Sequence, residues 1–542
     1  MLHTISMYPR LDAKVLFKVF MDKSQLPATA IELNKEFKEA LELMENSSRS
    51  VFITGRAGTG KSTLLTHFFA TTRKKVVILA PTGVAALNVK GQTIHSFFKF
   101  RPNMTPARVR KLRSSDDGKN IYHKLDTIVI DEISMVRADL LDCVDKFLRL
   151  NGPNENKPFG GIQMIFIGDL HQLSPVVTGD DKEIFTTLYK TPYFYGAHLF
   201  DTFEMEFVEL QKVYRQHDEK FIDLLNSVRN NTITEKGLAL LMKRCNPNFE
   251  PAPGDFSVYL TTTNAMAETI NMAQMEKLET PLNIFTGEIE GNFGKDSLPT
   301  AIDLQIKAGA QIMMLNNDVE GRWVNGSIGE VRGLIRNQKG EDVIIADLDD
   351  GSTVEIEPYS WEIYRSFVDE GQLGSEVIGT FTQYPLMLAW AVTIHKSQGK
   401  TFDNVIIDIG RGAFAHGQTY VALSRCTSLE GIVLVKPLQK KDIWTDYKVV
   451  DFLAKYQGKK ADQANPLDEK RARIEKAIRN KSTLKITYLK PNGEKSVRKI
   501  KPETMGEMGF AGKTYLGVIA FCQMRNQLRT FRVDRMLEIE EV

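Results

Sequence analysis

The chain has 542 residues, which is too long for one hydrophobic core and indicates about three or four domains. Hydrophobic residues make up 42% and charged residues 25%, as in a soluble globular protein, and no apolar run reaches the roughly 18 residues that span a bilayer. The four cysteines form no CxxC pair, which argues against a zinc site and indicates a reducing compartment. We therefore expect a cytoplasmic protein without a membrane partner.

Short apolar runs rich in Val and Ile alternate with longer amphipathic stretches. This alternation is typical of βαβ units, in which both faces of a parallel sheet are covered. It predicts strands at Val51–Thr54, Val76–Ala80, Thr127–Ile130, Met164–Ile167, Val258–Thr261, Val405–Ile409 and Gly431–Val435, with one more buried strand at Pro385–Ile394. Two α/β domains, at residues 1–200 and 201–456, account for these strands better than one.

Two insertions and a linker are also expected. Residues 99–120 are polar and basic, and interrupt the first domain. Residues 310–365 alternate between apolar and polar positions and carry turn signals at Asn325-Gly326 and Asp349-Asp350-Gly351, which predict a small β-barrel or a set of hairpins. Residues 457–470 are polar with Gly and Pro, and predict a linker.

The C-terminal segment 471–542 carries most of the positive charge. It contains 16 Lys and Arg against 8 Asp and Glu, a net charge of +8, whereas the first 470 residues have a net charge of −6. A short helix at Ala472–Arg479 and a hairpin that turns at Pro491-Asn492-Gly493 are expected here. The charge is compatible with nucleic-acid binding, or with a solvated basic surface that has no ligand.

Residues 55–62, with the sequence GRAGTGKS, have the pattern of a phosphate-binding loop between a strand and a helix. Such a loop needs glycines so that backbone N–H groups can face a phosphate, a lysine for the β- and γ-phosphates and a hydroxyl for Mg²⁺. The expected nucleotide site consists of Gly55, Ala57, Gly58, Thr59, Gly60, Lys61, Ser62 and Thr63. ATP and Mg²⁺ are the expected cofactors.

Two carboxylates follow the strand at Thr127–Ile130. Asp131 is placed to hold Mg²⁺ together with Ser62, and Glu132 to polarise the attacking water. An Asp-Glu pair at a strand end can also be only a helix start, but the upstream phosphate-binding loop favours catalysis. Gln172 follows the strand at Met164–Ile167, where it could sense the γ-phosphate. Two arginines, Arg215 and Arg425, are candidates for stabilising charge on the transferred phosphoryl group.

In order along the chain, these segments resemble the motifs of superfamily one B DNA helicases, and most closely the petite-integration-frequency (PIF) family. The segments that carry the resemblance are GRAGTGKS at 55–62, APTGVAALNVKGQTIHSFF at 80–98, DEISMV at 131–136, GDLHQLSPV at 168–176, VYRQ at 213–216, AVTIHKSQGKTFDNVIIDI at 391–409 and YVALSRCTS at 420–428. The resemblance covers roughly residues 30–440.

The resemblance implies two RecA-like domains with ATP in the cleft between them and single-stranded DNA across both. It gives Lys61, Asp131, Glu132, Gln172, Arg215 and Arg425 catalytic roles. It also places five residues along the DNA, which are Thr82, Gly83, His95, His395 and Ser397. From their spacing alone, the two histidines would be interpreted as core residues. Insertion 99–120 would be a wedge region, and the second insertion would cover the DNA exit.

One position departs from the family pattern. The family has a glutamine that reads adenine near its N-terminus, whereas Phe37 stands there in this chain, within Leu33-Asn34-Lys35-Glu36-Phe37. We therefore expect weak discrimination between ATP and other nucleoside triphosphates.

The C-terminal segment resembles a WYL domain, which is a small Sm-like β-barrel. The triplet is Thr514-Tyr515-Leu516, so the tryptophan is missing, and RTFRVDR at 529–535 matches the closing pattern of the domain. The positive charge, with Tyr515 and Phe531 among arginines, favours binding of nucleic acid over contact with a protein.

The sequence therefore predicts a monomeric, ATP-dependent helicase that acts on single-stranded and forked DNA. Its expected location is a cytoplasm of the bacterial type, in association with the nucleoid. The 5′ to 3′ direction, and roles in DNA replication, repair and telomere maintenance, are implied by the family. Two alternatives stay open: a translocase that strips proteins from DNA without unwinding it, and a nucleotide-gated DNA-binding regulator.

Overall fold

The computed structural model describes residues 33–542 except 102–103, 113–117, 178–184, 186, 253, 295–297, 338–339, 370–371, 411, 413–414, 492, 494 and 511–512. Parts of the basic insertion 99–120 and of the predicted turn at 491–493 therefore lie outside the described residues. The side chains of 118–120, 365–369, 372–375, 510 and 513 lie outside them as well.

The first lobe contains a parallel sheet that, in the described residues, has six strands in the order β3-β2-β4-β5-β1-β6. Val, Ile and Phe fill the strands and are buried against helices on both faces, in two separate apolar clusters. The strands are β1 (Val51–Gly55), β2 (Val76–Ala80), β3 (Gln92–Thr93), β4 (Thr127–Ile130), β5 (Gln163–Ile167) and β6 (Glu206–Leu210). The helices are α1 (Lys35–Asn46), α2 (Lys61–Thr71), α3 (Gly83–Asn88), α4 (Ile94–Phe98), α5 (Gly118–Lys124) and α6 (Ala138–Asn151).

The second lobe has a smaller parallel sheet, with the strand order β18-β7-β19-β20 in the part of the chain that the structure describes. The strands are β7 (Val258–Thr261), β18 (Ala391–Thr393), β19 (Val405–Asp408) and β20 (Ile432–Leu434), and the helices are α8 (Glu219–Arg229), α9 (Glu235–Met242), α10 (Asn264–Lys277) and α11 (Gln418–Leu423). The predicted strands are confirmed within one or two residues at their ends.

Two details of the predicted lobes are wrong. The first sheet continues past residue 200, because β6 pairs with β1 in parallel register. The run Pro385–Ile394 is two strands rather than one: β17 (Leu386–Leu388) joins an antiparallel sheet, and β18 joins the second parallel sheet. Continuous hydrophobicity indicates burial but does not reveal which sheet receives each half of a run.

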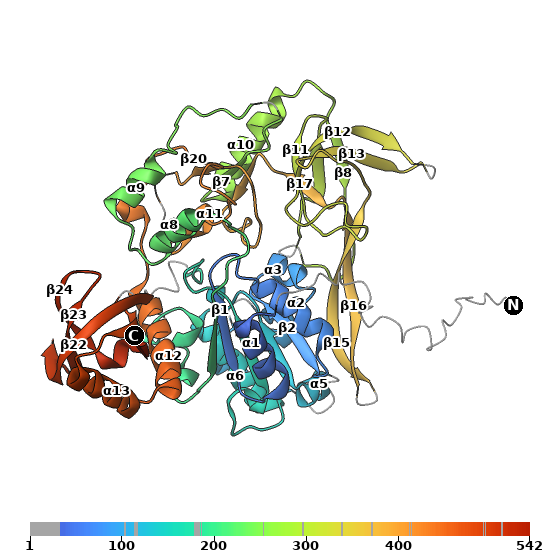
Figure 1. Cartoon of the computed structure of the whole chain (residues 1–542). Helices are drawn as coiled ribbons and strands as arrows, with labels where there is room; N and C mark the ends of the chain where they lie inside the picture. Colours follow the sequence, from blue (N-terminus) through green and yellow to red (C-terminus); the bar gives the residue numbers. More distant parts are fainter. Residues whose placement is uncertain are drawn as a thin grey trace.

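Antiparallel strands are inserted between β7 and β18 of the second lobe. One sheet has the order β14-β13-β12-β11-β17, and a long hairpin of β15 and β16 pairs with β9. Figure 1 shows this hairpin running from the upper lobe down beside the first lobe, where it contacts α5. The bounds are β8 (Asn283–Thr286), β9 (Glu288–Gly291), β10 (Asp303–Ile306), β11 (Gln311–Met314), β12 (Ile328–Arg336), β13 (Asp342–Leu348), β14 (Thr353–Ile356), β15 (Tyr359–Asp369) and β16 (Gln372–Gln383).

The C-terminal part begins with α12 (Tyr447–Ala464) and α13 (Leu467–Asn480). An antiparallel sheet follows, whose described strands have the order β24-β23-β22-β21-β25. Its apolar core also takes Ile474 and Ala477 from α13. The strands are β21 (Leu484–Leu489), β22 (Lys495–Phe510), β23 (Lys513–Cys522), β24 (Gln527–Arg532) and β25 (Met536–Glu541).

The predicted linker at 457–470 is largely helical, which corrects the sequence-based expectation. Asp446 caps α12 by accepting a hydrogen bond from Lys448 N, and the helix continues to Ala464. Leu453, Gln457 and Ala461 are buried at intervals of four residues, so the polar residues between them occupy the opposite face of one helix. Polar composition therefore reflected the exposed face of a helix and not an irregular segment.

Helix α12 lies between the first lobe and the C-terminal sheet (Figure 1). On one side, Phe452 stacks on Tyr195 with ring centroids 4.0 Å apart and also contacts Phe52 of β1. This aromatic packing fixes α12 on the first lobe. In the described part of the chain, no helix is long and apolar enough to cross a membrane.

Candidate active site

The phosphate-binding loop lies where β1 ends and α2 begins. Gly58 and Gly60 have φ values of +78° and +82°, in the left-handed region that favours glycine. A Cβ on Gly55 would lie 2.6 Å from Thr59 Oγ1, so this position also requires glycine. The loop can therefore approach a phosphate with its backbone, as the sequence predicted.

Lys61 begins α2 and its ammonium lies inside the loop. Its Nζ donates to the carbonyl oxygens of Gly55, at 2.8 Å, and Arg56, at 3.0 Å. Burial lowers the pKa of Lys61, and the carboxylates of Asp169 and Glu132 oppose this effect. Ser62 follows on the exposed side of the first helical turn. These residues fit the phosphates and the Mg²⁺ of a bound nucleotide.

The two predicted carboxylates stand at the end of β4. Burial raises the pKa of Asp131 to about 6. Burial, and then the charge of Asp131, raise the pKa of Glu132 to about 7. Glu132 has a φ of +49°, which is strained for a residue with a Cβ and is typical of functional positions. A carboxylate with a pKa near neutrality is suited to act as a general base.

A glutamine from the second lobe contacts the two predicted catalytic residues Glu132 and Gln172 of the first lobe. Gln398 Nε2 donates to Glu132 Oε2 at 2.8 Å and to Gln172 Oε1 at 3.3 Å. Gln172 is 5% exposed, at the predicted place after β5. Sequence reasoning did not select Gln398, although it lies inside the segment 391–409 that carries the family resemblance.

The two predicted arginines converge from different segments. Tyr214 N donates to Gly58 O at 2.8 Å, which holds the adjacent Arg215 beside the loop. Arg215 Nη1 donates to Ser424 O at 3.2 Å. Arg425 is 1% exposed, and its Nη2 donates to Ser424 Oγ at 2.9 Å. Burial, and then Arg215, lower the pKa of Arg425 to about 9, while Tyr420 and Glu132 oppose this effect.

A buried ion pair next to this site was not predicted. Arg229 Nη2 of α8 lies 2.9 Å from Asp169 Oδ1, and the two side chains are 8% and 0% exposed. Burial would raise the pKa of Asp169, but Arg229 and Lys61 hold it far below the usual range of an aspartate. Asp169 lies within the motif at 168–176 and could have been suspected, whereas nothing in the sequence marks Arg229.

Tyr420 of α11 makes another contact between the lobes. Its hydroxyl accepts a hydrogen bond from Ala57 N, at 3.0 Å. Burial raises the pKa of Tyr420 to about 12, so the phenol stays neutral. A backbone N–H of the phosphate-binding loop is thus bonded directly to the second lobe.

The predicted DNA residues occupy different environments. Thr82 is exposed and caps α3 by accepting from Ala85 N at 3.2 Å, and Gly83 is the first residue of that helix. His95 and His395 are half-buried, and burial lowers the pKa of both. Ser397 is fully buried and donates to Ile394 O at 2.8 Å, so its position does not support a direct DNA contact.

A series of hydrogen-bonded polar side chains links the two segments that are predicted to contact DNA. Asn325 Nδ2 donates to Asn88 Oδ1, at the end of α3, at 3.0 Å. Lys400 Nζ in turn donates to Asn325 Oδ1. Burial lowers the pKa of Lys400 to about 8. The turn before β12 therefore connects α3 with the segment that carries His395.

The side chain at the position of the family's adenine-reading glutamine is packed into the hydrophobic core. Phe37 of α1 is 2% exposed, and a Cβ on Gly60 would lie 3.1 Å from its Cζ. The amide of Asn34 is engaged as well: Oδ1 accepts from Phe37 N at 2.9 Å, and Nδ2 donates to Tyr214 Oη at 3.4 Å. Neither side chain offers the hydrogen bonds that a glutamine would give to a base.

Two parallel sheets, a phosphate-binding loop at the carboxyl end of a strand and two arginines, which follow β6 and α11, define the class of two-lobed RecA-like P-loop ATPases. The profile of the PIF1-like helicase family matches residues 32–237, and that of the WYL domain matches residues 469–541. The ATP-dependent DNA helicase Pif1 of Bdellovibrio bacteriovorus is 33% identical over 441 residues, which are 80% of this chain and 94% of that relative. The chain belongs to the PIF1-like helicase family.

Solved structures give the same result. Unliganded Pif1 from Bacteroides sp has a TM-score of 0.71 at 36% identity, over 79% of this chain and 97% of that one. Bacteroides Pif1 bound to single-stranded DNA has a TM-score of 0.59 at 36% identity, over 79% and 98%. By TM-score, this chain is more similar to the unliganded structure than to the DNA-bound one.

Proposed function

We propose that this chain is an ATP-dependent DNA helicase that moves 5′ to 3′ on single-stranded DNA and unwinds duplex DNA. The observation that carries the proposal is the contact of Gln398 with both Glu132 and Gln172 across the cleft. A change at the γ-phosphate would alter this contact and would so be transmitted to the second lobe. Membership of the PIF1-like helicase family supports DNA as the polymer along which the protein moves.

The residues of the cleft take distinct roles in this proposal. Lys61 binds the β- and γ-phosphates, Ser62 and Asp131 hold Mg²⁺, and Glu132 orients and deprotonates the attacking water. Arg215 and Arg425 stabilise the charge that develops on the phosphoryl oxygens. Bound Mg²⁺ would neutralise part of the phosphate charge. The remaining loop positions, Gly55, Ala57, Gly58, Thr59, Gly60 and Thr63, surround the nucleotide.

The DNA path runs over Thr82, Gly83 and His95 in the first lobe and over His395 in the second. Backbone amides, hydroxyls and imidazoles at these places can hold phosphates without reading sequence. The hydrogen bonds that join Asn88, Asn325 and Lys400 would couple the DNA-binding segments of the two lobes. These segments could then move in turn as the cleft opens and closes. Unwinding has to offset about 1.4 kcal/mol of stacking for each base-pair step, which requires coupling to ATP.

The remaining parts are assigned by the same proposal. A monomer would act on single-stranded and forked DNA in the cytoplasm, near the nucleoid. The insertion 99–120 would be the wedge, and the antiparallel sheets after β7 would cover the DNA exit. The C-terminal antiparallel sheet, preceded by α13, would form an Sm-like barrel, and it would add nucleic-acid contacts.

The proposal is tested by DNA-stimulated ATP hydrolysis and by unwinding of a forked duplex. The variant Lys61→Ala should lose both activities, because the loop lysine no longer neutralises the phosphates. The variant Lys236→Ala, at an exposed position of α9, is the matched control and should keep both. A rate of ATP hydrolysis that does not depend on the length of the single-stranded DNA would instead support the nucleotide-gated regulator.

The direction of movement, and the choice between unwinding and protein stripping, need a second experiment. Forks that carry only a 5′ tail or only a 3′ tail should show a preference for the 5′ tail. A preference for the 3′ tail would overturn the assigned direction. A protein block placed on a single strand separates unwinding from stripping: a stripping translocase would clear the block but leave the duplex intact.

A further inference from the structure

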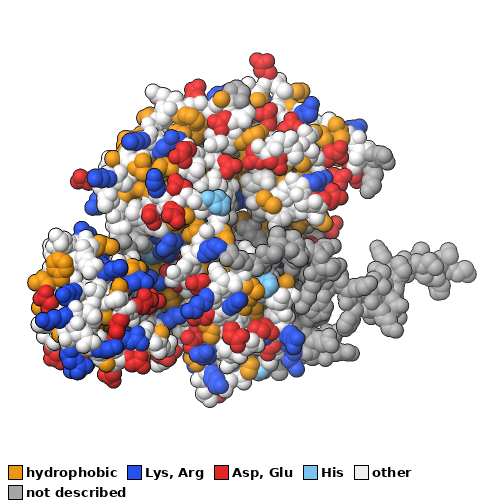
Figure 2. All heavy atoms as spheres, viewed as in Figure 1, with side chains coloured by type: hydrophobic (Ala, Val, Ile, Leu, Met, Phe, Trp, Pro, Cys, Tyr) orange, Lys and Arg blue, Asp and Glu red, His pale blue; other side chains and the backbone are white. Residues whose placement is uncertain are grey.

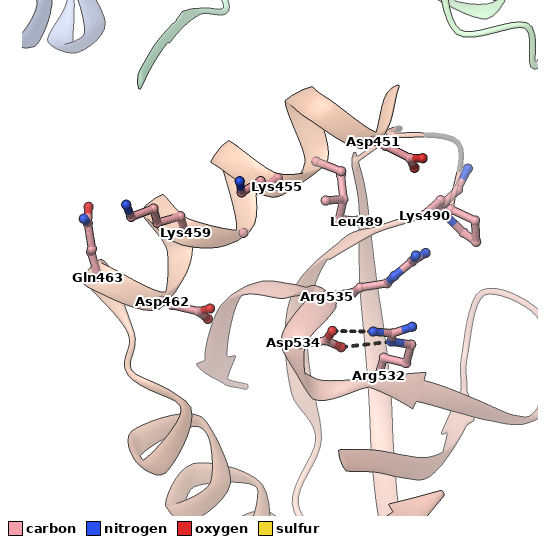
Figure 3. Close-up of a pocket in the computed structure, with 13 residues that line it drawn as sticks. Asp451, Lys455, Lys459, Asp462, Gln463, Leu489, Lys490, Arg532, Asp534 and Arg535 are labelled. Atoms are coloured by element: carbon pink, nitrogen blue, oxygen red, sulfur yellow. Dashed lines mark hydrogen bonds and ion pairs between the residues drawn. The ribbon is translucent and has the colours of Figure 1, made fainter. Parts of the chain in front are cut away.

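A cavity lies at the junction between α12 and the C-terminal sheet. Its volume is about 600 Å³, within the range of about 300–1,000 Å³ that is typical of ligand sites. Five basic side chains line it, namely Lys455, Lys459, Lys490, Arg532 and Arg535. Figure 3 shows them on both sides, with Lys455 and Lys459 along α12 and with Arg532 and Arg535 on the opposite wall. We call this cavity the α12 groove.

Most acidic side chains in the α12 groove are already neutralised. Asp534 pairs with Arg532, whose Nε lies 3.0 Å from Oδ1. Asp462 pairs with Lys470, whose Nζ lies 2.7 Å from Oδ1. In the part of the chain that the structure describes, neither Lys455 nor Arg535 forms an ion pair. Lys459 is also paired, with Glu204, at 2.6 Å. The positive charge that is available to an anionic ligand therefore comes from Lys455 and Arg535.

The shape of the α12 groove favours a chain over an enclosed small molecule. Lys455 and Lys459 are exposed, and Lys490 and Arg535 are half-buried, so one side opens to solvent. Among the described residues, no aromatic side chain lines the groove, so it offers no ring on which a base could stack. Long flexible cations around an open groove are suited to phosphates that follow one another along a backbone. Figure 2 shows basic side chains gathered along this junction, mixed with acidic ones.

The aromatic side chains expected to stack on nucleic acid are not available. Phe531 is 3% exposed and belongs to the core of the C-terminal sheet. Tyr515 is half-buried, and the guanidinium of Arg532 lies 5.0 Å from its ring centroid. Neither ring is therefore placed to stack on a nucleobase without first leaving its contacts in the C-terminal sheet.

We propose that the α12 groove binds the phosphodiester backbone of single-stranded DNA. This inference rests on the proposed helicase function and adds the location of a second DNA site. Stacking of Phe452 on Tyr195 fixes one wall of the groove to the first lobe. Lys495 Nζ of β22 lies 2.7 Å from Glu209 Oε2 of β6, which fixes the other wall. DNA in the groove is thus held at a constant position relative to the ATP site.

The test measures binding of the full chain to oligothymidine by fluorescence anisotropy at several salt concentrations. Two oligonucleotides are used, of about 8 and about 40 nucleotides, because a single module covers about 4–16 nucleotides. The double variant Lys455→Glu/Arg535→Glu should leave binding of the short one unchanged. For the long one, the slope of log K against log[salt] should become shallower by about 1.4, since each lost phosphate contact contributes about 0.7.

The matched control is Lys499→Glu/Lys501→Glu, which makes the same charge change at exposed positions of β22. It should bind both oligonucleotides as the wild type does. An unchanged slope in the groove variant would overturn the proposal, and so would an equal change in the control. Equal loss with the short oligonucleotide would also overturn it, because the effect would then act through the lobes.

The milder variant Lys455→Gln/Arg535→Gln guards against misfolding, and its slope should change in the same direction by a smaller amount. Failure of the helicase proposal is separately visible. Wild-type protein without DNA-stimulated hydrolysis would refute that function, whereas the groove is judged from binding alone.

Discussion

The ATP cleft and the α12 groove are both junctions between parts of the chain, but they are built in opposite ways. In the cleft, the charged side chains are buried or half-buried and already bonded: Asp169 is 0% and Arg425 is 1% exposed. In the groove, cations such as Lys455 stand in solvent. A preorganised site stabilises charge that develops during a reaction, whereas mobile cations adapt to many positions of a sliding phosphate chain. Substitutions should therefore affect the cleft much more than the groove.

The largest effect is expected at Arg425. The variant Arg425→Lys keeps the charge but loses the planar fork that reaches Ser424 Oγ, and kcat for ATP should fall by about 10³–10⁵-fold. Nucleotide affinity should change little. The control Arg244→Lys alters a guanidinium that donates to Ile432 O, at 2.8 Å, and should keep kcat. A kcat close to wild type in Arg425→Lys would show that this residue is structural.

The next effect concerns Glu132 and pH. The variant Glu132→Gln should lower kcat by about 10²–10⁴-fold, because it removes the general base. In the wild type, burial and Asp131 raise the pKa of Glu132 to about 7, so the reactive carboxylate is lost as pH falls through this value. Below about pH 7, the rate should fall about tenfold per pH unit. Glu235→Gln, at an exposed position of α9, should keep the wild-type profile, and a wild-type rate that stays flat to acidic pH would exclude this role.

A third effect concerns stability. The variant Arg229→Met leaves Asp169 as an uncompensated buried charge and should destabilise the native state by about 3–5 kcal/mol at neutral pH. Because Arg229 depresses the pKa of Asp169, the wild-type advantage is present above about pH 4 and shrinks as pH falls further. Urea unfolding of the wild type and the variant at several pH values measures this difference in the free energy of unfolding.

Two controls accompany this measurement. The double variant Arg229→Met/Asp169→Asn should recover part of the loss, because no charge stays buried alone. Arg471→Met breaks an exposed pair with Glu475 and should cost no more than about 0.5 kcal/mol. If Arg229→Met were equally mild, the buried pair would not hold the cleft together.

The smallest effect is expected for the nucleobase. Sites that read a base through hydrogen bonds reject the wrong one by about 10⁴–10⁵-fold. Because Phe37 and Asn34 are engaged within the protein, kcat/KM for ATP, GTP and CTP should agree within about tenfold. Steady-state hydrolysis of the three nucleotides measures this ratio, and a preference above about 10³-fold for ATP would show that another group reads adenine.

Much of the ATP site could be predicted because its residues lie at strand ends within short motifs. The loop at 55–62 and the pair Asp131 and Glu132 depend on local spacing, which a sequence displays directly. Gln398, Arg229 and Tyr420 were missed because their roles depend on the packing of the second lobe against the first. Spacing along the chain does not contain that information.

The C-terminal part was less predictable for two physical reasons. The polar run at 457–470 looked like a linker, but a helix with one buried face has the same composition on its other face. Phe531 looked available among arginines, but alternation along β24 directs it into the core and leaves its neighbours outside. In both cases, packing against a neighbouring part of the protein determines which face of the helix or strand is buried.

The contact between Lys495 and Glu209 affects how the C-terminal part should be removed in the laboratory. Glu209 is paired with Thr54 across β1 and β6, directly beside the phosphate-binding loop, and it also accepts from Gln457 of α12. A truncated protein that ends before α13 would keep Gln457 but lose the only cation that lies within 4 Å of Glu209 in the described structure. A slower ATPase in such a truncation would then report a damaged strand, and point substitutions in the groove are the cleaner tool.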